Sequence, residues 1–296
     1  MFDKNSIYAL LTAAFFASLG ILAKNIYNYD YMNSYVMLFY SSVFSVIFMF
    51  CILLIKYKNF SFLKNINRKG MIMAIFNGGL VALFLTNATS LKSLEYIDAG
   101  IQKVLVFSYP IFILAINGIL LGKKLEKKDI ISILIMMIGL ILTIGKIEGS
   151  TNVITGIIIA LSSSLFNAIY SILEENSKVE ISDQLVYWFY AFIAASICST
   201  VFLFFSNDLV NIKYTLNNWI LLTLLISCAV FCFTLPYVCF LKSIEKIGAI
   251  KTGIILSIAP VLTILLSIII LHERLTVIQT FGTLLIIGST VFSSLK

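Results

Sequence analysis

Apolar stretches of about 20 residues recur along the whole chain, separated by short polar connections. A helix of that length crosses the hydrocarbon core of a membrane, which is about 30 Å thick. The stretches are continuously apolar and do not alternate, so they predict helices and not the strands of a barrel. We therefore expect an all-α integral membrane protein with ten transmembrane helices. The predicted spans are 6–27, 33–55, 70–91, 97–121, 129–146, 152–173, 184–205, 218–241, 248–271 and 276–294.

The first span is longer than the apolar part of a cleavable signal, which runs to about 15 residues, so we expect it to be retained. The composition excludes a soluble domain: 60% of the 296 residues are hydrophobic, 12% are charged, and the mean hydropathy is +1.03. A soluble domain carries about a quarter charged residues. The net charge of +7 lies in short loops between spans. It therefore indicates no nucleic-acid partner, and the expected surroundings are the lipid bilayer.

The basic loops predict the orientation, because loops rich in lysine and arginine stay in the cytoplasm. Two such loops follow the second and the fourth span, on the same side of the membrane. They contain Lys56, Lys58, Lys64, Arg68 and Lys69, and Lys123, Lys124, Lys127 and Lys128. We expect a multi-pass protein of the cell membrane with both termini in the cytoplasm.

An internal repeat with an offset of 150 residues runs through the chain. Residues 91–97 (Leu-Lys-Ser-Leu-Glu-Tyr-Ile) match residues 241–247 (Leu-Lys-Ser-Ile-Glu-Lys-Ile). The same offset pairs identical residues elsewhere: Phe16 with Phe166, Val36 with Val186, Tyr40 with Tyr190 and Pro110 with Pro260. We expect two repeats, 1–150 and 151–296, within one membrane domain.

Each repeat holds five predicted spans, which is an odd number. The second copy must therefore enter the membrane from the opposite face. Inverted repeats of this kind are frequent in secondary transporters, because two near-equivalent halves can expose a central site to either side in turn. A duplicated membrane scaffold without transport is the alternative.

The C-terminal residues 272–282, His-Glu-Arg-Leu-Thr-Val-Ile-Gln-Thr-Phe-Gly, are followed by another glycine at 288. With the ten spans and the duplication, this run resembles the drug/metabolite transporter superfamily, and within it the EamA family. Members carry Gly-Glu-x-Leu-Thr between the last two spans. Here His272 replaces the glycine, whereas Glu273 and the following Leu and Thr keep the pattern. The first repeat keeps less of it, since Lys123 stands where Glu is usual.

The resemblance covers essentially the whole chain. It implies a central cavity lined by the first, third, fourth, sixth, eighth and ninth helices. It also implies that the fifth and tenth helices pack outside, where a homodimer contact is frequent. Family substrates include amino acids, drugs, nucleotide sugars and choline, so the resemblance implies a small-molecule substrate without identifying it.

Charged and polar side chains inside spans are the first candidates for a substrate site, because a charge at a helix centre costs about 2.5–3.5 kcal/mol on insertion scales. Lys103, with Gln102 beside it, and Lys251 lie in the fourth and ninth spans. Two ammonium groups on a cavity wall would hold a carboxylate or a phosphate. The alternative is that both lysines extend to the membrane interface.

Neutral polar and aromatic residues complete the predicted substrate site. They are Asn77, Asn167, Tyr109, Tyr170 and Tyr237. Asn167 and Tyr170 share a helix face and suit an amino acid or a similar metabolite, although asparagines in spans also bond helix to helix. Trp188 and Trp219 lie near predicted span ends and are expected to anchor the protein at the interface.

No Asp or Glu is found near the middle of a predicted span. Lys24 and its repeat partner Glu174 are assigned to helix ends near the surface. Proton-coupled transporters usually carry an acid in a span, so the pattern favours facilitated diffusion or exchange. The chain contains no phosphate-binding Gly-x-x-x-x-Gly-Lys-Ser/Thr loop, which argues against direct ATP drive.

The five cysteines all lie in apolar segments and predict no disulfide framework. Cys228 and Cys232 are one helical turn apart, but the single histidine is His272, so we expect no metal site. The sequence also contains no nucleophile–base pair. We therefore expect no cofactor and no enzyme activity.

The favoured function is secondary transport of a small polar metabolite, such as an amino acid or an organic anion, as an exporter or exchanger that works by alternating access. A quaternary amine such as choline is the alternative substrate; the tyrosines would form its aromatic cage, but the acid that usually accompanies one is missing. A flippase for a lipid-linked carrier, or a membrane partner without transport, is the alternative function.

Pro110 and Pro260 lie at matched positions in the fourth and ninth spans, where each removes a backbone hydrogen bond. We expect them to act as symmetric pivots. Replacing both with Ala is expected to slow solute exchange across a vesicle membrane while leaving substrate binding largely intact. Unchanged flux in the double variant would contradict this role.

Overall fold

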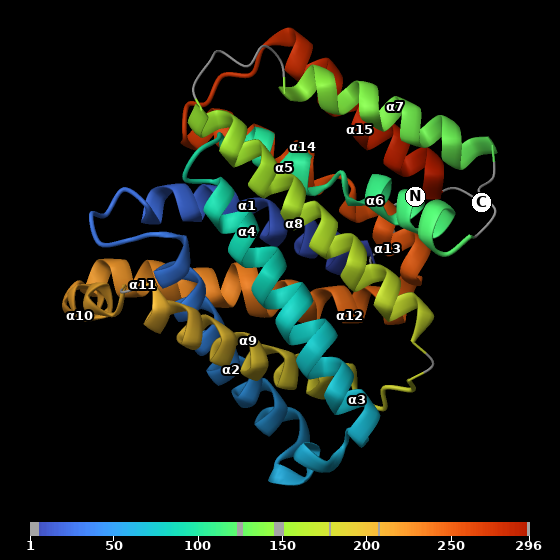
Figure 1. Ribbon diagram of the computed structural model, residues 1–296. Coiled ribbons are helices and arrows are strands. Elements are labelled where there is room, and N and C mark those ends of the chain that lie inside the picture. Colours follow the sequence, from blue (N-terminus) through green and yellow to red (C-terminus); the bar gives the residue numbers. More distant parts are fainter. Residues whose placement is uncertain (1–5, 123–126, 145–150, 178, 207, 295–296) are drawn as a thin grey trace.

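Apolar helices make up most of the computed structural model (Figure 1), which describes residues 6–122, 127–144, 151–177, 179–206 and 208–294. Within these ranges there is no strand; seven helical spans are long and apolar enough to cross a membrane, and three more contain shorter apolar helices. The spans in chain order are α1 (Ile7–Ile26), α2 (Ser34–Tyr57), α3–η3–α4 (Arg68–Ser93), α5–α6–η4 (Ala99–Leu120), α7 (Lys127–Ile144), α8 (Thr151–Asn176), α9 (Gln184–Phe205), α11–η5–α12 (Trp219–Ile247), α13–α14 (Ala249–Ile270) and α15 (Val277–Ser294).

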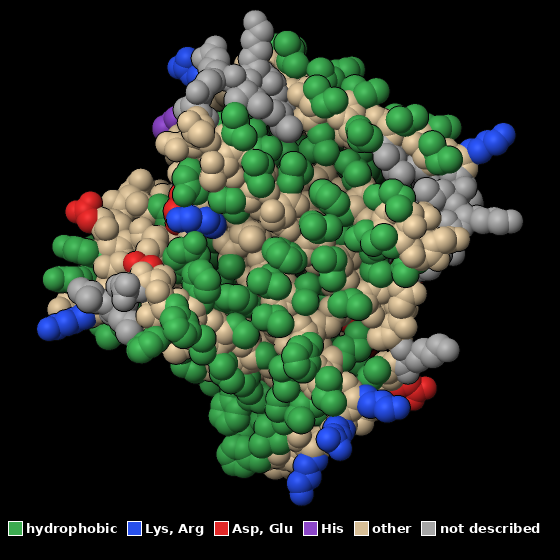
Figure 2. Space-filling view, in the orientation of Figure 1, with side chains coloured by type: hydrophobic (Ala, Val, Ile, Leu, Met, Phe, Trp, Pro, Cys, Tyr) green, Lys and Arg blue, Asp and Glu red, His purple; other side chains and the backbone are tan. Residues whose placement is uncertain are grey.

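The ten predicted transmembrane helices are therefore confirmed. The predicted and observed ends agree within a few residues, with the largest difference at the eighth span, which continues to Ile247. A short helix that the hydropathy pattern does not predict, α10 (Leu209–Asn217), precedes that span. Figure 2 shows the surface expected of a protein in lipid, with hydrophobic side chains across the face and most charged ones near its margin.

Two of the spans begin at polar caps that the repeat places in register. Asn33 accepts hydrogen bonds from the backbone N–H groups of Tyr35 and Val36 at the start of α2. Its repeat partner, Asp183, does the same for Leu185 and Val186 at the start of α9. A capping side chain satisfies donors that the first turn of a helix leaves free.

The two repeats pack against each other through matched pairs of helices. In one pair, α9 crosses η3 (Ala74–Leu85), where a Cβ on Gly78 would lie only 2.9 Å from the Cβ of Ala191. In the other, α2 crosses the junction of α11 with η5 (Ala229–Thr234), and Ser41 bonds to Cys228. Ser41 and Cys228 are the repeat partners of Ala191 and Gly78. The duplication is thus visible in the packing as well as in the sequence.

The third and eighth spans also share widened, π-helical turns, since η5 corresponds to residues 79–84 of η3 at the repeat offset. A π-helical turn bonds each N–H to a carbonyl five residues earlier. After η3, the Thr86 hydroxyl donates to the carbonyl of Val81 (2.9 Å). The Asn87 amide donates to the carbonyls of Ala82 and Leu83 at 3.3 and 2.9 Å.

The fourth and ninth spans are each divided into two helices, as the prolines predict. α5 ends at Val106 and α6 (Tyr109–Ala115) begins with Pro110 in its first turn. α13 ends at Leu256 and α14 (Ala259–Ile270) likewise begins beside Pro260. The proposed role of the two breaks as pivots stays a prediction.

The fifth and tenth spans, α7 and α15, lie side by side at one edge of the molecule (Figure 1). Their backbones approach closely at two glycines: a Cβ on Gly139 would lie 2.8 Å from the carbonyl oxygen of Gly282. Small residues permit such approaches between membrane helices. The homodimer expected at this edge stays a prediction, as does the domain boundary at residue 150.

Gly79 tests the packing of η3 against α9. A Cβ there would lie 2.5 Å from the Cβ of Ala194 and 2.8 Å from the carbonyl oxygen of Ala191. We expect Gly79→Ala to lower the free energy of unfolding by about 1–3 kcal/mol through overpacking. The matched control is Gly253→Ala, where a Cβ meets nothing within 4 Å and alanine favours the helix by about 1 kcal/mol. Thermal unfolding in detergent measures both, and equal midpoints would contradict the packing argument.

Candidate functional site

A pocket of about 920 Å³ opens where α2 and α8 end and α9 begins. Its walls come from the last turns of α8, the start of α9 and the second half of α12 (Leu235–Ile247), with Lys56 of α2 at the rim. Six of its lining residues are acids or lysines, four of the former and two of the latter. They are Glu174, Glu175, Asp183, Glu245, Lys56 and Lys242.

Glu174 is held in this pocket by neutral donors from two other helices. The amide of Asn77 in η3 and the hydroxyl of Tyr187 in α9 both donate to its Oε2 atom, at 3.1 and 3.2 Å. Among the described residues Glu174 has no salt bridge. The carboxylate is therefore fixed in position, and no basic side chain in the described part of the chain forms an ion pair with it.

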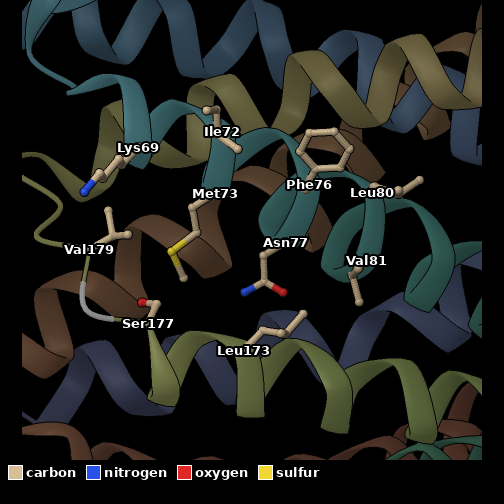
Figure 3. A pocket seen from close by; sticks show the side chains of 10 residues that line it. All are labelled: Lys69, Ile72, Met73, Phe76, Asn77, Leu80, Val81, Leu173, Ser177 and Val179. Atoms are coloured by element: carbon tan, nitrogen blue, oxygen red, sulfur yellow. The ribbon is translucent and has the colours of Figure 1, made fainter.

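A second, smaller pocket of about 440 Å³ lies on the other side of Asn77, between η3 and α8 (Figure 3). Figure 3 shows Asn77 projecting from η3 towards α8, among mostly apolar neighbours, with Lys69 at one end. Asn77 is 5% exposed, and its Oδ1 atom is buried and has no hydrogen-bond partner among the residues that the structure describes. Asn77 thus borders one pocket and bonds to the acid of the other.

Aromatic rings lie at the inner side of the larger pocket. The Trp188 ring is 6.2 Å from that of Tyr170 and 4.2 Å from that of Tyr237, measured between centroids. Tyr237 in turn meets the edge of Phe16 at 5.8 Å and that of Phe192 at 5.7 Å. The predicted interface role of Trp188 is wrong, because this side chain is only 4% exposed, whereas Trp219 is 75% exposed.

Lys103 lies behind this aromatic layer. Its Nζ atom donates to the backbone carbonyl of Phe16 (2.7 Å) and lies 5.9 and 5.3 Å from the ring centroids of Phe16 and Phe107. The residue is 9% exposed and lines neither pocket. Lys103 is therefore a buried ammonium group, separated from the larger pocket by Phe16, Tyr237 and Trp188.

The other predicted site residues divide into two groups. Tyr170 lines the larger pocket and Asn77 the smaller one. Tyr109, Asn167, Gln102 and Lys251 line neither pocket. The amide of Gln102 bonds to the carbonyl and the hydroxyl of Ser90 at 3.1 and 2.8 Å, joining α5 to α4 (Thr86–Ser93). Lys251 is exposed.

Sequence reasoning missed Glu174. The predicted sixth span ends at residue 173, but α8 continues to Asn176 and carries Glu174 inside the helix. Glu174 lies in the last turn of α8, at the helix end where the sequence places it, but it bonds to Asn77 and Tyr187 and lines the larger pocket, a role that the sequence does not assign to it. A signal was present in the four-residue spacing of Tyr170 and Glu174, which puts both on one helix face. Within the described residues, no group of three His, Cys, Asp or Glu could hold a metal ion.

At the ends of the spans that lie away from the larger pocket, Glu273 of the run 272–282 connects the two repeats. The carboxylate of Glu273, which follows α14, accepts hydrogen bonds from the backbone N–H groups of Ala99 and Gly100 at 2.8 and 3.1 Å. These are the first residues of α5, so an acid of the second repeat caps a helix of the first. The matched residue in the first repeat, Lys123, lies outside the described residues.

Asp183 lies at the rim of the larger pocket, where it pairs with Lys56 (2.8 Å) and accepts a hydrogen bond from Tyr57. Burial alone would raise the pKa of this carboxyl, but the hydrogen bonds from Lys56 and Tyr57 outweigh that effect and lower it. Ionised Asp183 therefore stabilises the fold above the ordinary aspartate pKa of about 3.9. That contribution is lost as the pH falls through the lower pKa of the folded state.

We expect Asp183→Ala to lower the free energy of unfolding at pH 7 by about 1–2 kcal/mol, through loss of the cap and the ion pair. Asp183→Asn keeps the cap and is expected to cost less. Asn33→Ala is the matched control, because it removes the equivalent cap of α2 without a charge. Chemical unfolding between pH 3 and 7 measures the free energy of unfolding of the three variants and of the unchanged protein. A loss at Asp183→Ala that is the same at both ends of the range would contradict the charge contribution.

Comparison with known proteins identifies the family. Residues 4–145 and 154–295 each match the model of the EamA-like transporter family. Three Bacillus subtilis (strain 168) proteins, each described as an uncharacterized transporter, are similar: YcbK is 26% identical over 73% of this chain and 70% of its own length, YetK 22% over 72% and 65%, and YyaM 23% over 73% and 71%. A solved crystal structure has the same fold, with a TM-score of 0.62 at 13% identity over 98% of this chain and 96% of that one. Because two copies of the family model together span nearly all of its residues, this chain belongs to the EamA-like transporter family, and it is a multi-pass membrane transporter and not an enzyme.

Proposed function

We propose that the protein moves a small polar metabolite across the cell membrane by alternating access, and that its larger pocket is the cytoplasmic entrance. One observation carries the proposal: a cavity of about 920 Å³ opens at the ends of α2 and α8 and is bounded by Trp188, whose ring lies 4.2 Å from that of Tyr237 between centroids. At the other face, Glu273 ties the second repeat to the start of α5. A pocket open on one side and a contact closed on the other are what one end state of alternating access requires.

The direction of opening follows from the charge of the loops. Lys56, at the rim of the pocket, begins the basic connection between the second and third spans. Basic loops stay in the cytoplasm. On this argument both termini are cytoplasmic, and the pocket is open to the inside of the cell.

The path for the solute would continue past the aromatic layer to Lys103. Phe16 and Tyr237 would have to separate for a solute to reach the ammonium group, which is now bonded to the carbonyl of Phe16. An amino acid suits this path, because its ammonium group would meet Glu174 at the entrance and its carboxylate would meet Lys103 further in. An organic anion would have only the second contact.

The smaller pocket favours a second candidate, a flippase for a lipid-linked carrier. Its walls are mostly apolar, with side chains such as Ile72, Phe76 and Leu173, and Lys69 lies at one end. An acyl chain would fit such walls, and a phosphate headgroup would pair with Lys69. The larger pocket, with its four acids and two lysines, has no role in this candidate function.

Efflux from proteoliposomes tests the proposal. Vesicles loaded with amino acids, organic anions, phosphorylated metabolites and quaternary amines are compared with protein-free vesicles by mass spectrometry. We expect selective loss of one polar class, and slower loss with Lys103→Ala. Selective loss that Lys103→Ala leaves unchanged would contradict the inner position of the path. Scrambling of a fluorescent lipid without solute loss would favour the flippase.

Cysteine labelling in the same vesicles, sorted by orientation, tests the direction of opening. Ser171 lines the pocket, and Asn28 is exposed in the first connection, on the opposite side. With Cys51→Ala as the parent, we expect a membrane-impermeant maleimide to label Ser171→Cys only from the cytoplasmic side and Asn28→Cys only from outside. The reverse pattern would overturn the orientation.

A further inference from the structure

The larger pocket carries an excess of negative charge, because four acids and two lysines line it. Lys56 is already paired with Asp183, and the Nζ atom of Lys242 lies 5.6 Å from the ring centroid of Tyr8. Of the other acids, Glu174 accepts hydrogen bonds from Asn77 and Tyr187 and has no salt bridge to a basic residue among those that the structure describes. A carboxylate in this condition attracts a cation, because an opposite charge stabilises its ionised form.

Aromatic rings lie next to this carboxylate. Tyr170 precedes Glu174 by one turn of α8, and Trp188 follows Tyr187, which donates to Glu174. The rings of Tyr170 and Trp188 are 6.2 Å apart, and both line the pocket with Glu174. The face of a tryptophan or tyrosine ring attracts an organic cation within about 6 Å of its centroid. An acid beside two such rings is the arrangement that a substituted ammonium group requires.

Comparison of the two repeats shows that these three side chains are present in the second copy only. At the offset of 150 residues, the partners of Tyr170, Glu174 and Trp188 are Gly20, Lys24 and Leu38. The first copy thus has no ring and no acid at these positions, and it has a lysine where the second has the glutamate. The three side chains are therefore not required by the fold that both copies share.

We propose that Glu174, Tyr170 and Trp188 form a recognition site for the ammonium group of an organic cation, which makes an ammonium compound the substrate class of the transporter. This inference rests on the proposed function. The glutamate supplies the opposite charge, the two rings contact the substituents on nitrogen, and Asn77 with Tyr187 holds the carboxylate in place. An organic anion has no partner in this site.

Trp188 offers a direct measurement, because the chain has two tryptophans and the other, Trp219, is 75% exposed. In Trp219→Phe protein, fluorescence reports on Trp188 alone. The probes are choline, its neutral isostere 3,3-dimethyl-1-butanol, ethanolamine and succinate. We expect saturable changes with choline and ethanolamine, and none with the isostere or succinate. Equal responses to choline and the isostere would overturn the proposal.

Two substitutions in Trp219→Phe protein distinguish the effect of the charge of Glu174 from that of a negative charge elsewhere on the protein. Glu174→Gln keeps an acceptor for Asn77 and Tyr187 and is expected to weaken choline binding about tenfold or more. Glu180→Gln, the matched control, removes the same charge from an exposed residue that does not line the pocket, and is expected to change the affinity less than about twofold. Thermal unfolding verifies that both variants are folded. Unchanged affinity in folded Glu174→Gln protein would overturn the proposal.

Counterflow in proteoliposomes separates this inference from the function on which it rests. Uptake of labelled choline or ethanolamine, abolished by Glu174→Gln, supports both. Uptake of succinate but of neither cation would overturn the ammonium site and leave the transporter. Saturable binding of choline at Trp188 with no flux of any probe would support the site and count against transport of these compounds.

Discussion

Lipid offers no hydrogen-bond partner, so every amide and carbonyl of the spans must be satisfied within the protein. Continuous helices meet this constraint by themselves, and at two departures from a continuous helix polar side chains bond to the backbone carbonyls nearby. At the break before Pro110, the hydroxyl of Ser108 donates to the carbonyl of Leu105 (2.6 Å) and lies 3.2 Å from that of Ser164. After the widened turns of η3, Thr86 and Asn87 bond to the carbonyls of Val81, Ala82 and Leu83. A polar residue within a span can thus bond to the backbone of a helix or bind a solute. Only the residues that are not used for the first purpose are available for the second.

This double use explains what the sequence could and could not predict. Hydropathy predicts the spans and the offset of 150 residues predicts the duplication, because both are properties of the chain itself. The direction in which a side chain points depends on the rotation of its helix. One additional residue in a turn changes that direction by about 100°. Lys103 and Glu174 illustrate the result: Lys103, the charge that looked central, is sealed beneath Phe16, whereas Glu174, assigned to a helix end, lines the larger pocket.

The two copies share a scaffold and differ in chemistry. The crossings of α9 with η3 and of α2 with η5 are equivalent, and so are the caps at Asn33 and Asp183. The acid and the rings of the pocket are found in the second copy only. The contact from Glu273 to α5 belongs to one membrane face, and its sequence counterpart is a lysine. The architecture is thus nearly symmetric, whereas the pocket residues and the contact of Glu273 with α5 each occur once.

The matched widened turns also preserve the register between the two copies. A π-helical turn accommodates one residue more than an α-helical turn, so an insertion in one copy alone would shift the offset beyond it by one residue. The offset is 150 both before these segments, at Val36 and Val186, and after them, at residues 91–97 and 241–247. Both copies therefore carry the additional residue, at residues 79–84 and 229–234. The register of the duplication is therefore unbroken across the widened turns, and the helical segments that follow them start from equivalent rotations in the two copies.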